Sequence, residues 1–170
     1  MDVEDEADFR SFAASRMRDL RRTAYLLCGD WHHADDVTQT VLTKLYGNWH
    51  KIQERERVDS YVRTMLVRAA FERRRRFWWR RELSSAQPPD TPADVDNHVE
   101  DRVVLLEALG KMPPRQRAVL VLRFWEDLDV AETAATLGCS EGTVKSQTAR
   151  GLTNLRALLA DSHLMEGRSS

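Results

Sequence analysis

Cysteine is scarce in this chain of 170 residues, where Cys28 and Cys139 stand alone and far apart. Two isolated cysteines cannot build a disulfide framework or a zinc site, so we expect both to be small buried side chains. The five histidines show no metal-ligand spacing, and no glycine-rich phosphate loop or nucleophile motif occurs. The sequence therefore predicts no metal, no cofactor, no catalytic residue and no enzymatic activity.

Long apolar runs and strand-like alternation are also missing. No run approaches the roughly 18 residues of a membrane-spanning helix, and the sequence shows no signal-peptide pattern, so we expect a cytoplasmic protein without a membrane partner. Hydrophobic residues make up 42% of the sequence, which is ordinary for a folded protein. Because apolar residues recur at steps of three and four, the predicted fold class is all-α.

Charge divides the chain into three parts. Residues 1–83 carry 17 basic and 14 acidic side chains, residues 84–101 carry five acidic and no basic ones, and residues 102–170 carry nine and eight. The stretch 84–98 also contains three prolines, which predicts a flexible acidic linker. We expect two small helical domains, residues 1–83 and 99–162, with a tail at 163–170. Mildly basic blocks on both sides of the linker suggest two DNA-facing modules.

The segment from Asp129 to Arg156 has the pattern of two helices joined by a tight turn. Asp129 and Glu132 have the spacing of a capping box, and Gly138 can end the first helix in the left-handed conformation. Ser140 can cap the second helix. Small residues, Ala134 and Ala135, stand where the two helices must cross closely.

The second helix of this pair keeps apolar residues from Val144 onward on one face and hydrogen-bond donors on the other. This pattern is typical of a helix-turn-helix whose second helix enters the DNA major groove. A plain helical hairpin with a polar outer face is the alternative. The predicted DNA-binding residues are Thr143, Lys145, Ser146, Gln147 and Arg150. The preceding segment RQRAVLVLRFW is apolar almost all round, and we expect it to be the buried centre of the second domain.

The first domain reads as three helices. We expect residues 2–8 to be frayed, a first helix from Phe9 to Cys28, a second from near His33, and a third from Asp59. The second helix places Asp35, Asp36 and Gln39 in its first turns, where carboxylates either complement the helix dipole or face a partner. Residues 47–58 read as a loop with exposable groups, among them Asn48, Trp49 and His50.

The third helix ends in ERRRRFWWRR, which contains six arginines and two tryptophans. Guanidinium groups follow phosphates and indole faces stack on unpaired bases, so this composition favours single-stranded nucleic acid. A solvated charged face, with a tryptophan closing the core, is the alternative. The predicted contacts are Arg68, Arg73, Arg74, Arg75, Arg76, Trp78 and Trp79.

Taken together, these motifs resemble a bacterial RNA polymerase sigma factor of the extracytoplasmic-function type, in the sigma-70 superfamily, nearest to the actinobacterial SigE-like group. The resemblance covers about residues 9–160. It is most specific from Met112 to Arg156, which is similar to region four, whereas ADDVTQTVLTKLY and the helix from Tyr61 to Arg81 resemble region two.

The resemblance implies a dissociable subunit that directs core RNA polymerase to promoters and helps open the minus-ten element. Asp35, Asp36 and Gln39 would dock on the clamp of the β′ subunit, and the second domain would dock on the β flap. Asn48, Trp49 and His50 would line a pocket for a flipped minus-ten base, and the helix beginning near Ser140 would read the minus-thirty-five element. An anti-sigma protein is a further implied partner.

Three positions and one run depart from the family pattern: Thr40 replaces an acid, Gln147 an arginine and Gly151 an alanine, and the run ERRRR replaces an end that contains asparagine and aspartate. These departures affect promoter preference more than membership of the family. The competing interpretation is a free-standing dimeric helix-turn-helix regulator. It requires a palindromic operator and no polymerase, and the basic aromatic helix end and the acidic linker fit it poorly.

Overall fold

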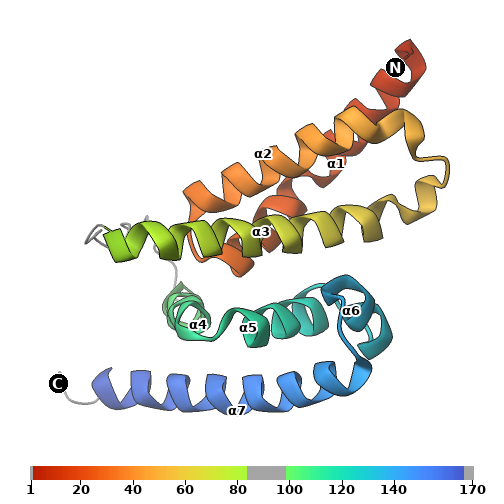
Figure 1. The fold of residues 1–170 in the computed structure, drawn as a ribbon. Coiled ribbons are helices and arrows are strands. Elements are labelled where there is room, and N and C mark those ends of the chain that lie inside the picture. The colour runs from red at the N-terminus through yellow and green to blue at the C-terminus, as the bar shows by residue number, and fades with distance from the viewer. Residues whose placement is uncertain (1, 84–98, 167–170) are drawn as a thin grey trace. The chain divides into compact units, whose positions relative to one another are not determined.

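The computed structural model describes residues 2–83 and 99–166 of the chain, which are almost entirely helical (Figure 1). No strand occurs in these two ranges, and the all-α prediction is confirmed. The chain divides into two compact units, Met1–Ser84 and Ser85–Ser170. The predicted linker, residues 84–98, lies outside the described residues, so the predicted domain limits stay a prediction.

The first unit begins with helix α1, Val3–Cys28, which starts earlier than the sequence predicts. The Asp2 side chain caps it by accepting a hydrogen bond from the backbone N–H of Asp5 at 2.8 Å, and acidic residues fill its first turn. Carboxylates stabilise the positive end of a helix, so the predicted fraying of residues 2–8 is wrong. Gly29 ends α1 in the left-handed conformation, at φ 78°.

Helix α2, Trp31–Asn48, also starts earlier and ends later than predicted. The Asp30 side chain caps it by accepting from the backbone N–H of His33 at 3.1 Å, so the helix begins at Trp31. Two short 3₁₀ turns, η1 (Trp49–Lys51) and η2 (Arg55–Arg57), follow in place of an irregular loop. Helix α3 then runs over Val58–Leu83.

The core of the first unit forms where α1, α2 and α3 pack on one another (Figure 1). The helical spacing of apolar residues in the sequence predicts inward positions on α2 and α3, namely Val37, Val41, Leu45, Val62, Met65, Leu66, Ala69 and Ala70. All three on α2 are buried, as are Val62, Leu66 and Ala70 on α3, whereas Met65 and Ala69 are half-buried. Met17, predicted to lie on the apolar face of α1, is instead 40% exposed.

The second unit contains α4 (Val99–Lys111), α5 (Pro114–Leu120), a π-helical turn η3 (Val121–Trp125), α6 (Val130–Leu137) and α7 (Glu141–Glu166). The long helix α7 contacts α4, α5 and α6 (Figure 1). Helix α7 continues to Glu166, four residues into the predicted tail at 163–170. The last four residues of that tail lie outside the described part of the chain, and its limits stay a prediction.

The segment RQRAVLVLRFW is buried in its middle but not at its end. Residues 117–122 are all buried, whereas Phe124 is 61% and Trp125 is 54% exposed. The backbone N–H of Glu126 bonds to the carbonyl of Val121 at 3.0 Å, so this turn is wider than an α-helical one. The expectation that the whole segment is buried is therefore wrong for its two terminal aromatic residues.

The helix-turn-helix of α6 and α7 has the predicted caps. Asp129 accepts from the backbone N–H of Glu132 at 2.7 Å, and the Glu132 carboxylate accepts from the N–H of Asp129 at 2.9 Å. Gly138 ends α6 at φ 67°, where a residue with a Cβ is strained.

The crossing of α6 and α7 uses one alanine rather than two. Ala134 packs with Val119 and Val144 in a buried cluster, so a small residue is needed there. Ala135 is exposed, and its predicted place at the crossing is wrong.

We predict that Asp129→Ala lowers the free energy of unfolding by about 1 kcal/mol, because the backbone N–H of Glu132 loses its side-chain acceptor. Thermal denaturation followed by circular dichroism measures this loss. Asp129→Asn keeps an oxygen acceptor and should lose less, whereas equal losses in the two variants would show that the cap is not the cause.

Candidate nucleic-acid interface

The first turns of α7 present a polar face opposite a buried one. Val144 is fully buried against α5 and α6, and Ser140 caps the helix by accepting from the backbone N–H of Thr143 at 3.1 Å. Four of the five predicted DNA-binding residues share one side of the helix, because they follow the helical spacing of three and four. These four are Thr143, Ser146, Gln147 and Arg150. Lys145 lies on the other flank of the exposed surface.

These side chains differ in what they already contact. The Thr143 hydroxyl lies 2.9 Å from that of Ser140, and the Ser146 hydroxyl donates to the Thr143 carbonyl at 3.1 Å. Within the ranges that the structure describes, Lys145, Gln147 and Arg150 make no hydrogen bond or ion pair. Lys145 and Arg150 are exposed, so two cations and an amide are available to an incoming ligand.

A second polar face lies on α2. Asp36 and Gln39 are exposed and Asp35 is half-buried, and their spacing puts all three on one side of the helix. Because α2 begins at Trp31, both carboxylates lie beyond its first turn, and Asp30 provides the cap instead. The helix dipole acts mainly within the first turn, so dipole complementation explains these two carboxylates poorly.

Asp35 is held by a residue that the sequence did not single out. Arg21 of α1 forms an ion pair with Asp35, and its guanidinium carbon lies 4.4 Å from the centre of the Trp31 ring. Trp31 in turn stacks on Tyr25 with ring centres 4.0 Å apart. The pKa of Arg21 is raised above its ordinary value by the hydrogen bond and the charge of Asp35, although desolvation opposes the shift. This stack fixes one end of the acidic face.

The end of α2 and the connector that follows it, residues 49–57, contain the three residues that were predicted to line a pocket. These residues differ in how exposed they are. His50 is exposed, and Asn48 is half-buried and donates from its amide to the Lys44 carbonyl at 2.9 Å. Trp49 is 1% exposed, and its ring lies 5.3 Å from the rings of both Phe9 and Phe12. An indole buried among α1 aromatics is not available to an incoming base, so the expectation that Trp49 is exposed is wrong.

The basic aromatic stretch is described only in part. Arg68 is exposed on α3, one turn before the run of arginines. The backbone of α3 continues through that run to Leu83. The side chains of Arg73, Arg74, Arg75, Arg76, Trp78 and Trp79 lie outside the described part of the chain, and their predicted contacts stay predictions.

Two other kinds of feature are absent from the ranges 2–83 and 99–166. No group of three or more potential metal ligands comes together there. None of the helices in these ranges has both the length and the apolar character needed to cross a bilayer.

Comparison with known families accounts for both units. Residues 12–80 match the family model described as sigma-70 region 2, and residues 102–155 match that described as sigma-70 region 4. The RNA polymerase sigma-E factor of Streptomyces coelicolor is 37% identical over 155 residues, which is 88% of this chain and 84% of that protein. The chain belongs to the sigma-70 family.

The relatives also show the type of sigma factor. The extracytoplasmic-function (ECF) sigma factor SigM of Mycobacterium tuberculosis is 30% identical over 149 residues, 84% of this chain and 72% of its own. Sigma factors direct RNA polymerase to promoters and are not a class of enzymes. In this sigma factor the region 2 match contains the acidic face of α2, the connector and most of α3, and the region 4 match contains the helix-turn-helix.

Solved structures support the fold. The sigma factor RpoE of Bartonella quintana, solved in complex with the anti-sigma factor NepR, matches with a TM-score of 0.71 and 22% identity, over 90% of this chain and 97% of that one. CnrH, solved in complex with the cytosolic domain of CnrY, matches with a TM-score of 0.66 and 18% identity, over 92% and 90%.

Sequence patterns missed the residues that tie helices of this sigma factor together. Arg21 and Arg55 each stack on a tryptophan and bind carboxylates of another segment. No local pattern reveals such pairs, because the partners of Arg55 lie some fifty positions away on α1. The exposed pair Phe124 and Trp125 was also missed, since both continue an apolar run.

The position of Trp49 in the core can be tested directly by substitution. We predict that Trp49→Ala lowers the free energy of unfolding by about 3–5 kcal/mol, because a large cavity opens beside Phe9 and Phe12. Trp49→Phe should lose clearly less. Chemical denaturation measures both changes, and a loss near zero for Trp49→Ala would return the indole to the surface.

Proposed function

We propose that this sigma factor divides promoter recognition between its two units: α7 reads the minus-thirty-five element as duplex, and the connector with α3 holds the unpaired minus-ten strand. The face of α2 that carries Asp35, Asp36 and Gln39 docks on the β′ clamp of the polymerase, and the region 4 unit docks on the β flap. The chain performs no covalent chemistry, because the polymerase makes the RNA. It acts in the cytoplasm, with the polymerase.

The observation that carries this proposal is the polar face of α7 above a buried one. A helix lying in the major groove needs side chains that reach base edges, and its opposite side must pack on the protein. Val144 is fully buried on the packing side, while Gln147 and Arg150 carry donor groups on the other. Arginine is suited to the two acceptors of guanine, and glutamine to the acceptor and donor of adenine.

Docking on the polymerase is supported by the exposure of this face of α2. Asp36 and Gln39 are exposed, and Asp35 is half-buried and paired with Arg21. We infer that Asp36 and Gln39 make the larger contribution to a partner contact, since their side chains are the more exposed. Acidic residues on such a face favour a basic partner surface and faster association with it.

Minus-ten capture is supported by the position of the connector next to α3. His50 and the half-buried Asn48 lie at the start of the connector, and Arg68 is exposed on α3. Unpairing and flipping a base costs a few kcal/mol, which stacking and phosphate contacts must offset. Trp49, which is buried in the core, supports this region and does not contact the base.

Control by a separate anti-sigma protein is part of the proposal. The Bartonella RpoE structure contains such a partner, and its fold is shared by this chain. A protein that covers the α2 face would compete with the polymerase for the same residues.

We predict that Arg150→Ala weakens binding of the holoenzyme to a matched minus-thirty-five duplex by about 1–3 kcal/mol and relaxes base preference at one position. Fluorescence anisotropy with labelled promoter DNA measures the loss. Arg156→Ala, which removes an exposed arginine further along α7, should preserve the base preference. If both variants lose affinity equally for every sequence, Arg150 contacts only phosphate.

We also predict that Asp36→Ala lowers the affinity for core polymerase about tenfold, which is about 1.4 kcal/mol, while the melting temperature stays the same. Competition binding against the labelled wild-type chain measures the affinity. Asp19→Ala removes an exposed carboxylate from α1 and is the matched control. An unchanged affinity for Asp36→Ala would exclude this carboxylate from the interface.

A further inference from the structure

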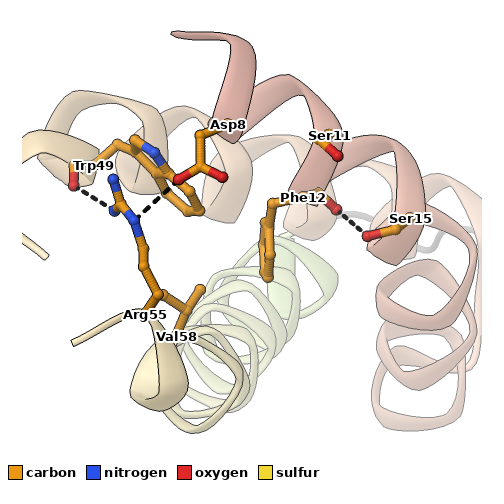
Figure 2. A pocket seen from close by; sticks show the side chains of 7 residues that line it. All are labelled: Asp8, Ser11, Phe12, Ser15, Trp49, Arg55 and Val58. Carbon is orange, nitrogen blue, oxygen red and sulfur yellow. Dashed lines mark hydrogen bonds and ion pairs between the residues drawn. The ribbon is translucent and has the colours of Figure 1, made fainter. Parts of the chain in front are cut away.

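Arg55 makes an unusual number of contacts for a residue in a short connector. Its Nη1 donates to the backbone carbonyls of Trp49 at 2.9 Å and Ile52 at 3.1 Å. Its Nη2 lies 3.1 Å from Oδ1 of Asp5, and its Nε lies 3.1 Å from Oδ2 of Asp8. Its guanidinium carbon also lies 4.2 Å from the centre of the Trp49 ring. Figure 2 shows Arg55 beside Trp49 and Asp8.

These contacts join two segments that are distant in the sequence. Asp5 and Asp8 belong to the first two turns of α1, and the two carbonyls belong to the connector around η1. A guanidinium group has a planar fork of five donors, so it can bind carbonyls and carboxylates at the same time. A lysine ammonium at this place could not reach all four acceptors.

We propose that Arg55, held by Asp5 and Asp8, is a positioning residue that sets the conformation of the connector for minus-ten recognition. The inference rests on the proposed function, in which the connector captures an unpaired base. Through the Trp49 carbonyl, Arg55 acts on the backbone next to Asn48 and His50. The N-terminal turns of α1 thereby take part in promoter opening without touching DNA.

The stability of the unit is not the whole explanation of these contacts. Trp49 also packs against Phe9 and Phe12, so its ring keeps aromatic contacts without Arg55. The side chains of Arg55, Asp5 and Asp8 are 37%, 27% and 53% exposed, so solvent screens these ion pairs and weakens their contribution to folding. Short 3₁₀ turns have few hydrogen bonds of their own, so a side chain that binds their carbonyls determines their geometry.

A direct phosphate contact is the competing role for an arginine in this place. The two carboxylates argue against it, because they occupy the Nη2 and Nε edges of the guanidinium and repel phosphate. The two roles also differ in salt dependence. Loss of a phosphate contact reduces the slope of log affinity against log salt by about one, whereas loss of a positioning contact leaves the slope unchanged.

The test uses holoenzyme reconstituted from the full chain and Streptomyces core polymerase. The probe is a forked DNA library with a duplex upstream part and a single-stranded non-template part, both randomised at the promoter elements. Sequencing of the bound fraction gives base preferences at each position. Arg55→Gln, Arg55→Lys and the double variant Asp5→Asn, Asp8→Asn are compared with the wild-type chain. Arg10→Gln is the matched control, since Arg10 is an exposed arginine of α1 outside the connector and pairs with Glu6, four residues away, at 2.6 Å.

We expect each of the three test variants to lower the base preference at the minus-ten positions about tenfold, because a small misplacement of a recognition element has large effects. Upstream preferences, the salt slope and the affinity for core should stay at wild-type values, and Arg10→Gln should behave as wild type. A variant that merely unfolds loses active protein equally for all sequences and leaves the preference ratios intact.

Three outcomes would overturn the inference. Unchanged minus-ten preferences in Arg55→Gln would make Arg55 a structural residue only. A reduced salt slope in Arg55→Gln, with no effect of the Asp5 and Asp8 variants, would make it a phosphate ligand. If wild-type holoenzyme itself shows no minus-ten preference, the proposed function of the connector fails first, and the role of Arg55 fails with it.

Discussion

The burial of one indole, that of Trp49, determines how the region 2 unit presents its functional surfaces. Its ring lies among the aromatic side chains of α1, and its backbone begins the connector that leads from α2 to α3. Aromatic burial of this kind contributes several kcal/mol, more than any exposed ion pair in the unit. The connector is therefore tied to the core at its first residue, and the groups around it are placed relative to that point.

In the region 4 unit, helix α7 must pack against the protein on one side and stay accessible to DNA on the other. Val144 and the small residue Ala134 allow α7 to cross α6 closely, while Gly138 permits the tight turn between them. The predicted DNA-binding residues then lie on the exposed side of α7, where they need no support from distant segments. Recognition in this unit depends on local geometry, whereas recognition in the region 2 unit depends on contacts between distant segments.

This difference explains how much the sequence could predict. The helix-turn-helix was predicted with its caps, because capping boxes and left-handed glycines are local patterns. The all-α class and the inward residues of α2 were predicted for the same reason. Trp49 was misplaced because an aromatic residue between helices suits a loop or a core equally, and only the positions of Phe9 and Phe12 decide between them. Phe124 and Trp125 were misplaced because they continue the apolar run on which the prediction depended, although the π-helical turn η3 leaves both exposed.

The central claim is that this chain is a sigma factor that gives core polymerase its promoter specificity. The most direct measurement is transcription in vitro from a fragmented genomic library by core polymerase, with and without the purified chain, followed by mapping of RNA 5′ ends. The claim predicts defined start sites that appear only with the chain present and share two upstream elements at fixed spacing. Starts that do not change when the chain is added, together with tight operator binding by a homodimer alone, would contradict it.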